Sequence, residues 1–186
     1  MRKAFLLGLV LFLIAIGCAG SQKTVEMEKK MEKPVKPPVI SRSFASPRIW
    51  PGEVWRIYLT ASDPDGEMKY IVSTIDQPGV GTYPVSLTRI KEEDRKELSG
   101  YIFLITFGLQ NLNFVNLTLT VQIQDTAGNY SQPEVFPLSF NNTYPQEFPP
   151  PGVFLEKDLG PILIQLRDIG EEGPRLLGSR GFPFRR

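Results

Sequence analysis

The chain has 186 residues and a formal net charge of +1, which leaves room for one ordinary domain with extensions and gives no electrostatic reason to expect a nucleic-acid partner. It contains no histidine, the commonest general base and metal ligand, and its single cysteine excludes an intrachain disulfide. The sequence shows no glycine-rich phosphate loop after a strand and no paired carboxylates in a setting typical of catalysis, which leaves a Ser/Lys or carboxylate-only enzyme as the alternative to a non-enzymatic protein. We therefore predict that the protein is not an enzyme and has no small-molecule substrate.

Residues 1–17 follow the three-part plan of a secretory signal peptide. Two basic residues are followed by an apolar run of about a dozen residues and then by small residues. This run is too short for a good membrane-spanning helix, which needs roughly 20 apolar residues. The stretch Ala15-Ile16-Gly17-Cys18 resembles the lipobox of bacterial lipoproteins, in which the cysteine thiol is alkylated by diacylglycerol and the cysteine becomes the first mature residue.

The resemblance implies that Cys18 carries a covalent lipid and serves as a membrane anchor, with no other cofactor required. Buried acyl chains contribute about 0.8 kcal/mol per methylene, so several chains hold a protein stably at a membrane where one chain is marginal. The expected location is the cell envelope. In a host with two membranes, Ala19 resembles the outer-membrane address of such lipoproteins. The alternative is an ordinary signal or anchor segment that contains a cysteine.

Residues 18–38 are predicted to form a flexible linker. Lysine and glutamate are mixed without a sustained apolar face, and Pro34, Pro37 and Pro38 end the segment. This composition is typical of a solvated tether, and twenty residues reach at most about 60 to 70 Å when extended.

Residues 39–142 are predicted to fold as an all-β domain. The clearest strand is Val115 to Asp125, where apolar and polar residues alternate with the period of a strand that buries one face. Such a face needs a second sheet to pack against. The other predicted strands are Val39–Phe44, Val54–Ser62, Met68–Ile75, Tyr83–Ile90, Tyr101–Phe107 and Glu134–Phe140. Pro137 indicates that the last of them lies at a sheet edge.

Seven strands in about 100 residues favour a single immunoglobulin-like (Ig-like) or fibronectin-III-like antiparallel β-sandwich. The turn Asp125-Thr126-Ala127-Gly128-Asn129-Tyr130-Ser131 resembles the turn between the last two strands of many bacterial extracellular Ig-like modules. The turn Asp63-Pro64-Asp65-Gly66 resembles their second-to-third strand turn. The chain lacks the paired cysteines and the third-strand tryptophan of antibody domains, so we predict Trp55 and Tyr70 as its core aromatic residues.

The two turns provide a candidate calcium site. In this topology they lie at the same end of the sandwich, which would allow Asp63, Asp65 and Asp125 to converge. Carboxylate oxygens are ligands that calcium prefers. The alternative is that these aspartates only make turns and cap strands.

Aromatic residues provide a second candidate site, for sugars or cell-wall polymer. The residues concerned are Trp50, Tyr58, Tyr83 and Tyr101. Aromatic residues in strands more often pack in a core or in cross-strand pairs, and that is the alternative here.

Residues 143–186 form a proline-rich tail that we predict to be largely extended. It contains two apolar islands that are candidate binding residues: Val153, Phe154, Leu155, Ile162, Leu163 and Ile164. Each island could add a strand to an exposed sheet edge, and the edge could belong to the same domain or to a partner.

Together these features predict a lipid-anchored, non-enzymatic lipoprotein. We expect its Ig-like domain and tail to mediate protein–protein interaction in the cell envelope, with the membrane and an envelope protein as partners. The alternatives are a carbohydrate-binding or wall-binding module and an adhesin stiffened by calcium. Fold alone does not decide among them, because such sandwiches carry many unrelated functions.

Overall fold

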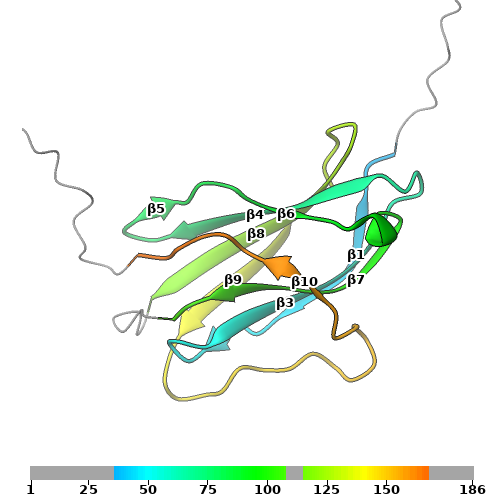
Figure 1. The fold of residues 1–186 in the computed structure, drawn as a ribbon. Coiled ribbons are helices and arrows are strands. Elements are labelled where there is room, and N and C mark those ends of the chain that lie inside the picture. Colours follow the sequence, from blue (N-terminus) through cyan, green and yellow to red (C-terminus); the bar gives the residue numbers. More distant parts are fainter. Residues whose placement is uncertain (1–35, 108–114, 168–186) are drawn as a thin grey trace, which may run out of the picture. The chain divides into compact units, whose positions relative to one another are not determined.

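The computed structural model describes residues 36–107 and 115–167 of the chain (Figure 1). These residues all belong to one compact unit, Pro34–Arg186. The predicted signal peptide, Cys18, most of the predicted linker and the last part of the tail lie outside the described residues. Within the described ranges, no helix is long and apolar enough to cross a membrane.

Two sheets form a β-sandwich, which confirms the predicted fold class. The first sheet has the order β1 (Val39–Ala45), β3 (Val54–Ser62), β7 (Glu97–Ile105), β10 (Asp158–Pro161). The second has the order β2 (Arg48–Ile49), β9 (Glu134–Phe140), β8 (Asn116–Asp125), β4 (Met68–Gln77), β5 (Gly81–Thr82), with β6 (Ser86–Arg89) also paired to β4. A short 3₁₀ helix, η1 (Glu92–Asp94), precedes β7. In Ig-like terms, β1, β3 and β7 are strands A, B and E, while β4, β8 and β9 are C, F and G.

The strands that the alternating pattern marked most clearly agree closely with the prediction. The segment Val54–Ser62 and the segment Glu134–Phe140 have the predicted bounds, and β8 begins one residue later than predicted. Of the predicted strand Tyr83–Ile90, only Ser86–Arg89 forms a strand, β6. The short strand β5 lies before the predicted start, and Pro84, which lacks a ladder donor, stands between the two. Pro137 lies beyond the stretch of β9 that β2 covers, at Ser139 and Phe140, as an edge proline requires.

The core fills the space between the sheets. Four apolar residues of β8 are buried in it: Leu117, Leu119, Val121 and Ile123. Trp55 is fully buried, as predicted, and its indole nitrogen donates a 2.8 Å hydrogen bond to the Ser46 carbonyl. The prediction for Tyr70 is wrong, because its ring is only half-buried and stacks under the Lys69 ammonium. It pairs with Gln124 on the outer side of the second sheet, where the strand alternation places it.

The tail returns to its own domain. β10 pairs in parallel with β7, in the position beside strand E that strand D holds in constant-type Ig domains. Residues 158–167, which we call the strap, then run across the open side of the sandwich and along the second sheet (Figure 1). Leu163 N–H donates to Ser86 Oγ at 2.8 Å, and Gln77 Nε2 donates to the Arg167 carbonyl at 2.9 Å.

Alternation within the strap explains its position. Ile162, Ile164 and Leu166 are buried in the core, whereas Leu163 between them is 74% exposed. The second apolar island therefore adds to an edge of its own domain, the first of the two alternatives stated above.

Candidate functional site

The outer side of the first sheet carries a cluster of aromatic rings. Tyr58 on β3 lies at the centre, with ring centroids 5.5 Å from Tyr101 on β7 and 5.7 Å from Phe154 of the tail. Phe44 and Phe103 complete the cluster, at 6.4 Å from Tyr58 and 6.5 Å from Tyr101. Tilted pairs at these separations are favourable. We call these five residues the aromatic face; the residues from Thr143 to Lys157 supply part of its cover through Phe154.

Polar groups tie the tail to this face. The Tyr58 hydroxyl donates to the Glu156 carboxylate at 3.1 Å. Glu156 lies 3.6 Å from the Arg56 guanidinium, which sits 4.8 Å above the centre of the Tyr101 ring. The carboxylate thus joins a buried phenol to a partly exposed cation.

The same network shifts two pKa values. The side-chain hydrogen bond with Tyr58 raises the pKa of Arg56, against the opposing effect of burial. Burial raises the pKa of Tyr58; Arg56 lowers it and the hydrogen bond to Glu156 raises it further. At neutral pH, Arg56 is therefore charged and Tyr58 is a protonated hydrogen-bond donor, so neither group exchanges protons readily there.

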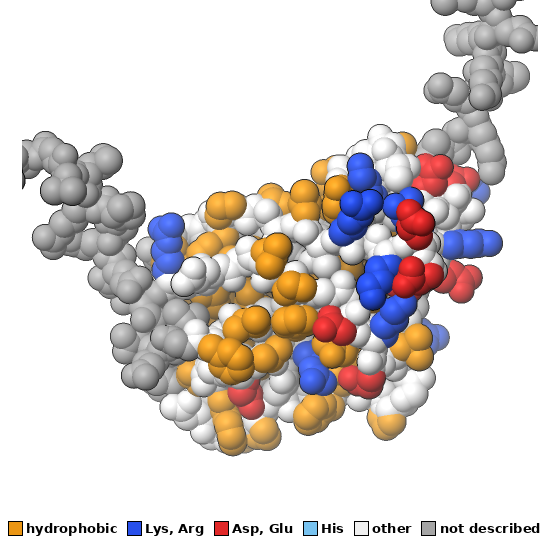
Figure 2. All heavy atoms as spheres, viewed as in Figure 1, with side chains coloured by type: hydrophobic (Ala, Val, Ile, Leu, Met, Phe, Trp, Pro, Cys, Tyr) orange, Lys and Arg blue, Asp and Glu red, His pale blue; other side chains and the backbone are white. Residues whose placement is uncertain are grey.

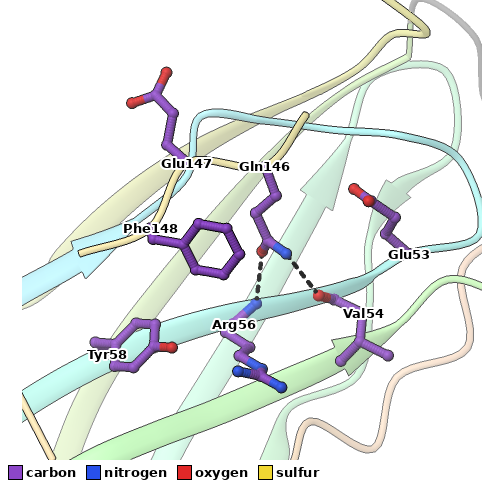
Figure 3. A pocket seen from close by; sticks show the side chains of 7 residues that line it. All are labelled: Glu53, Val54, Arg56, Tyr58, Gln146, Glu147 and Phe148. Atoms are coloured by element: carbon purple, nitrogen blue, oxygen red, sulfur yellow. Dashed lines mark hydrogen bonds between the residues drawn. The ribbon is translucent and has the colours of Figure 1, made fainter. Parts of the chain in front are cut away.

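A cavity of about 220 Å³ opens beside Arg56. Figure 3 shows the residues that line it: Glu53, Val54, Arg56, Tyr58, Gln146, Glu147 and Phe148. The Gln146 amide lies against β3, where its Oε1 accepts from Arg56 N–H and its Nε2 donates to the Val54 carbonyl, both at 3.2 Å. The Phe148 ring stands at the rim and is 76% exposed.

Five large apolar side chains are exposed in the segments near the end of the sandwich where β3 begins and β7 ends. They are Trp50, Ile105, Phe107, Tyr144 and Phe148, with exposed fractions from 43% to 76%. We call this group the apolar end. The turn before β3 is fixed there by Thr106, whose hydroxyl donates to the Glu53 carbonyl at 2.6 Å and accepts from Gly52 N–H at 3.1 Å. Figure 2 shows hydrophobic side chains gathered on one part of the visible surface and charged side chains on another.

No family model, no curated protein and no solved structure matches this chain. Its function is therefore argued from its own surface.

Two of the three predicted calcium ligands, Asp63 and Asp125, bond to their own turns, and the third, Asp65, accepts from Lys36 N–H at 3.1 Å. Asp63 accepts from Asp65 N–H at 2.9 Å and from Glu67 N–H at 3.1 Å. Both oxygens of Asp125 accept from Asn129, one from the backbone and one from the side-chain amide. In the part of the chain that the structure describes, no three or more acidic, histidine or cysteine residues are grouped to hold a metal ion. The three aspartates thus make turns, and the structure does not bring them together as a calcium site.

The predicted tail residues have different positions. Ile162 and Ile164 are buried in the chain's own core and present no side chain to a partner. Val153 and Phe154 are half-buried, whereas Leu155 and Leu163 are 60% and 74% exposed. Cys18 lies outside the described residues.

The four aromatic residues of the predicted sugar site differ in burial and do not form one exposed surface. Tyr58 and Tyr83 are buried, and the Tyr83 hydroxyl donates to Gln77 Oε1 at 2.5 Å. Tyr101 is half-buried under Arg56, and only Trp50 has an exposed ring. Sequence reasoning did not find Gln146 or Phe148. Their one signal was an aromatic residue beside prolines in a segment without periodicity, which does not show what the segment contacts.

Proposed function

We propose that this protein is a lipid-anchored, non-enzymatic lipoprotein whose sandwich binds another protein of the cell envelope through the apolar end. The observation that carries the proposal is the exposure of five large apolar side chains, from separate segments near the end of the sandwich where β3 begins. Clustered exposed apolar surface is typical of interaction sites, and Trp, Tyr and Phe are the residues that protein interfaces favour.

The path of the chain supports this function. Lys36 N–H donates to Asp65 Oδ2, in the turn that follows β3, so the chain enters the domain at the end opposite to the start of β3. A nine-residue strand is about 30 Å long. The described chain therefore enters the domain about one strand length away from the apolar end, which supports the apolar end as a binding surface.

The anchor itself rests on the resemblance of Ala15-Ile16-Gly17-Cys18 to a lipobox. A cell-envelope location, and the outer membrane in a host with two membranes, follows from the same motif and from Ala19. The carboxylates of Asp63 and Asp125 bond to their own turns, which gives no support to an adhesin stiffened by calcium.

Affinity capture from crosslinked native membranes tests the protein-binding proposal. We compare the full chain with an Ile105→Thr/Phe107→Ser variant and with a control, Val85→Thr/Leu163→Thr, which removes two apolar side chains that are exposed elsewhere. The same partner should be recovered with the full chain and the control, and the first variant should recover at least tenfold less. Equal recovery with all three proteins, each with an unchanged melting temperature, would exclude the apolar end as the binding surface.

A carbohydrate-binding function is the second candidate, favoured by the exposed Phe148 ring beside Glu53, Arg56 and the Gln146 amide. Sugars stack on such rings and bond to such polar groups. Retention on isolated wall polysaccharide that is lost with Phe148→Ala and kept with Ile105→Thr/Phe107→Ser would support it. Absence of retention would reject it.

A further inference from the structure

The first sheet has an incomplete edge. The ladder between β1 and β3 ends with the pair Ala45–Ile57, because the chain then crosses to the second sheet, where β2 pairs with β9. β3 begins three residues earlier, at Val54, and pairs with β7 along its whole length. The first three residues of β3 therefore pair with β7 on one side and, among the described strands, have no neighbour on the other, the side that β1 covers farther along β3.

A side chain takes the place of a strand at this edge. The Gln146 amide accepts from Arg56 N–H and donates to the Val54 carbonyl, both at 3.2 Å. In a parallel ladder, one residue donates its N–H to a carbonyl of the neighbouring strand and accepts, through its own carbonyl, from the N–H two residues farther along that strand. One primary amide therefore makes the two hydrogen bonds of a peptide main chain, as Figure 3 shows.

The cavity beside this amide has room and charge for a side chain. Its volume is about 220 Å³, and the exposed Phe148 ring lines one side. Of the other charged residues that line it, Glu147 pairs with Arg48 at 3.1 Å and Arg56 with Glu156 at 3.6 Å. Within the described residues, the Glu53 carboxylate accepts a hydrogen bond from Trp50 N–H and pairs with no cation, unlike the other two charged residues of the lining. A lysine or arginine side chain would complement it.

We propose that this edge of β3 is a strand-addition site for an extended, basic peptide segment of the partner protein. The segment displaces the Gln146 amide, bonds through its main chain to Val54 and Arg56, and places a lysine or arginine beside Glu53. Strand addition is a general mode of peptide recognition, in which the main chain supplies affinity and side-chain pockets supply specificity. The inference rests on the proposed function and names the kind of segment that the partner contributes.

Selection of peptides on the full chain tests the site. A library of random nine-residue peptides displayed on phage should yield sequences with a lysine or arginine at a fixed position. The strongest binder is then synthesised in three forms: unmodified, N-methylated at alternate residues, and N-methylated at the intervening residues. Because one set of N–H groups faces β3, one methylated form should bind at least tenfold more weakly and the other should bind like the unmodified peptide.

Three variants connect binding to the edge. Gln146→Ala removes the competing amide and should tighten the peptide about tenfold, since two hydrogen bonds no longer have to be displaced. Glu53→Gln should weaken it about tenfold. Gln122→Ala is the matched control, because its amide bonds to the Ser131 carbonyl in the second sheet, and it should change nothing.

The proposal is overturned if no peptide is enriched, if both methylated forms bind like the unmodified peptide, or if Gln146→Ala leaves the affinity unchanged. Retention of a wall polysaccharide that Gln146→Ala alters, without peptide binding, would also overturn it in favour of a sugar. These outcomes are separate from the function test, because that test alters Ile105 and Phe107, which do not line the cavity. If the peptide experiments fail but partner capture still depends on Ile105 and Phe107, the proposed function stands and only the strand-addition site is rejected.

Discussion

At the scale of single residues, Tyr58 links the aromatic face to the tail. Its hydroxyl donates to Glu156, and its ring contacts Phe154, so one side chain of β3 holds two residues from a distant part of the chain. The hydrogen bond depends on the phenol proton. Burial, the largest cause, raises the pKa of Tyr58 above its ordinary value of 10.0.

This shift predicts a loss of stability in alkali. The folded state retains a proton that the unfolded chain releases, so the contribution of Tyr58 is complete below about pH 10 and is lost as the pH rises through the folded-state pKa. Urea unfolding between pH 8 and pH 11.5 should show a free energy of unfolding that falls above pH 10. Tyr58→Phe should reduce this slope, while costing about 1 kcal/mol at neutral pH. An identical slope in both proteins would contradict the assignment.

Gly100 is a second residue whose identity the tail requires. A Cβ added there would lie 2.3 Å from the Lys157 carbonyl oxygen and 2.9 Å from Leu159 Cγ. Tyr101 N–H bonds to that same carbonyl at 2.9 Å, so the segment that leads into the strap cannot move away without losing a main-chain bond. We expect Gly100→Ala to destabilise the domain by about 1 to 3 kcal/mol, measured by urea unfolding. A wild-type midpoint would show that the strap adjusts easily.

At the scale of elements, alternation decided what the sequence could predict. β3, β8 and β9 were predicted almost to the residue, since one face of each is buried and the period of two is visible. β10 was not, because four residues containing glycine and proline have no period. It pairs with β7, and its Pro161 carbonyl accepts from the Thr88 hydroxyl of β6 at 2.8 Å, two partners that only the assembled sandwich brings together. The sequence therefore indicated apolar islands in the tail without showing which edge they join.

Alternation within the strap predicts opposite results for two neighbouring residues. Ile164 is buried, so Ile164→Ala should cost about 2 to 4 kcal/mol through lost burial and a cavity. Leu163 is 74% exposed, so Leu163→Ala should stay within about 0.5 kcal/mol. Chemical unfolding of both variants measures the difference. Equal effects would show that the strap does not pack as an alternating strand.

Two truncations test the strap as a whole. A stop after Asn142 removes Ile162, Ile164 and Leu166 from the core, each worth about 1.5 to 3 kcal/mol when buried. Because small domains have only about 5 to 15 kcal/mol of total stability, this chain should lose its cooperative thermal transition. A stop after Arg167 keeps all three residues and should melt like the full chain. Cooperative melting of the shorter protein would make the strap dispensable.

At the scale of the whole molecule, the candidate site was less predictable than the fold. The sequence placed the turns at Asp63 and Asp125 correctly, yet their carboxylates bond to turn backbone, which is what such residues do locally. The apolar end combines residues from separate turns, and the β3 edge combines a strand with a glutamine about 90 positions away. Neither arrangement leaves a local pattern, because both depend on where the strands bring the turns.

The proposed anchor would determine where this surface acts. From Cys18 to Lys36, the start of the described residues, the chain can span at most about 60 Å, so a lipid on Cys18 confines the apolar end to a layer near one membrane and raises its effective concentration for envelope partners. Cys18→Ser should move the protein from the membrane to the soluble fraction. Partner crosslinking in cells should fall, while the affinity of the purified variant for the isolated partner stays unchanged. A variant that still sediments with membranes would contradict lipidation at Cys18, and a reduced affinity in solution would show that the N-terminal segment itself contacts the partner.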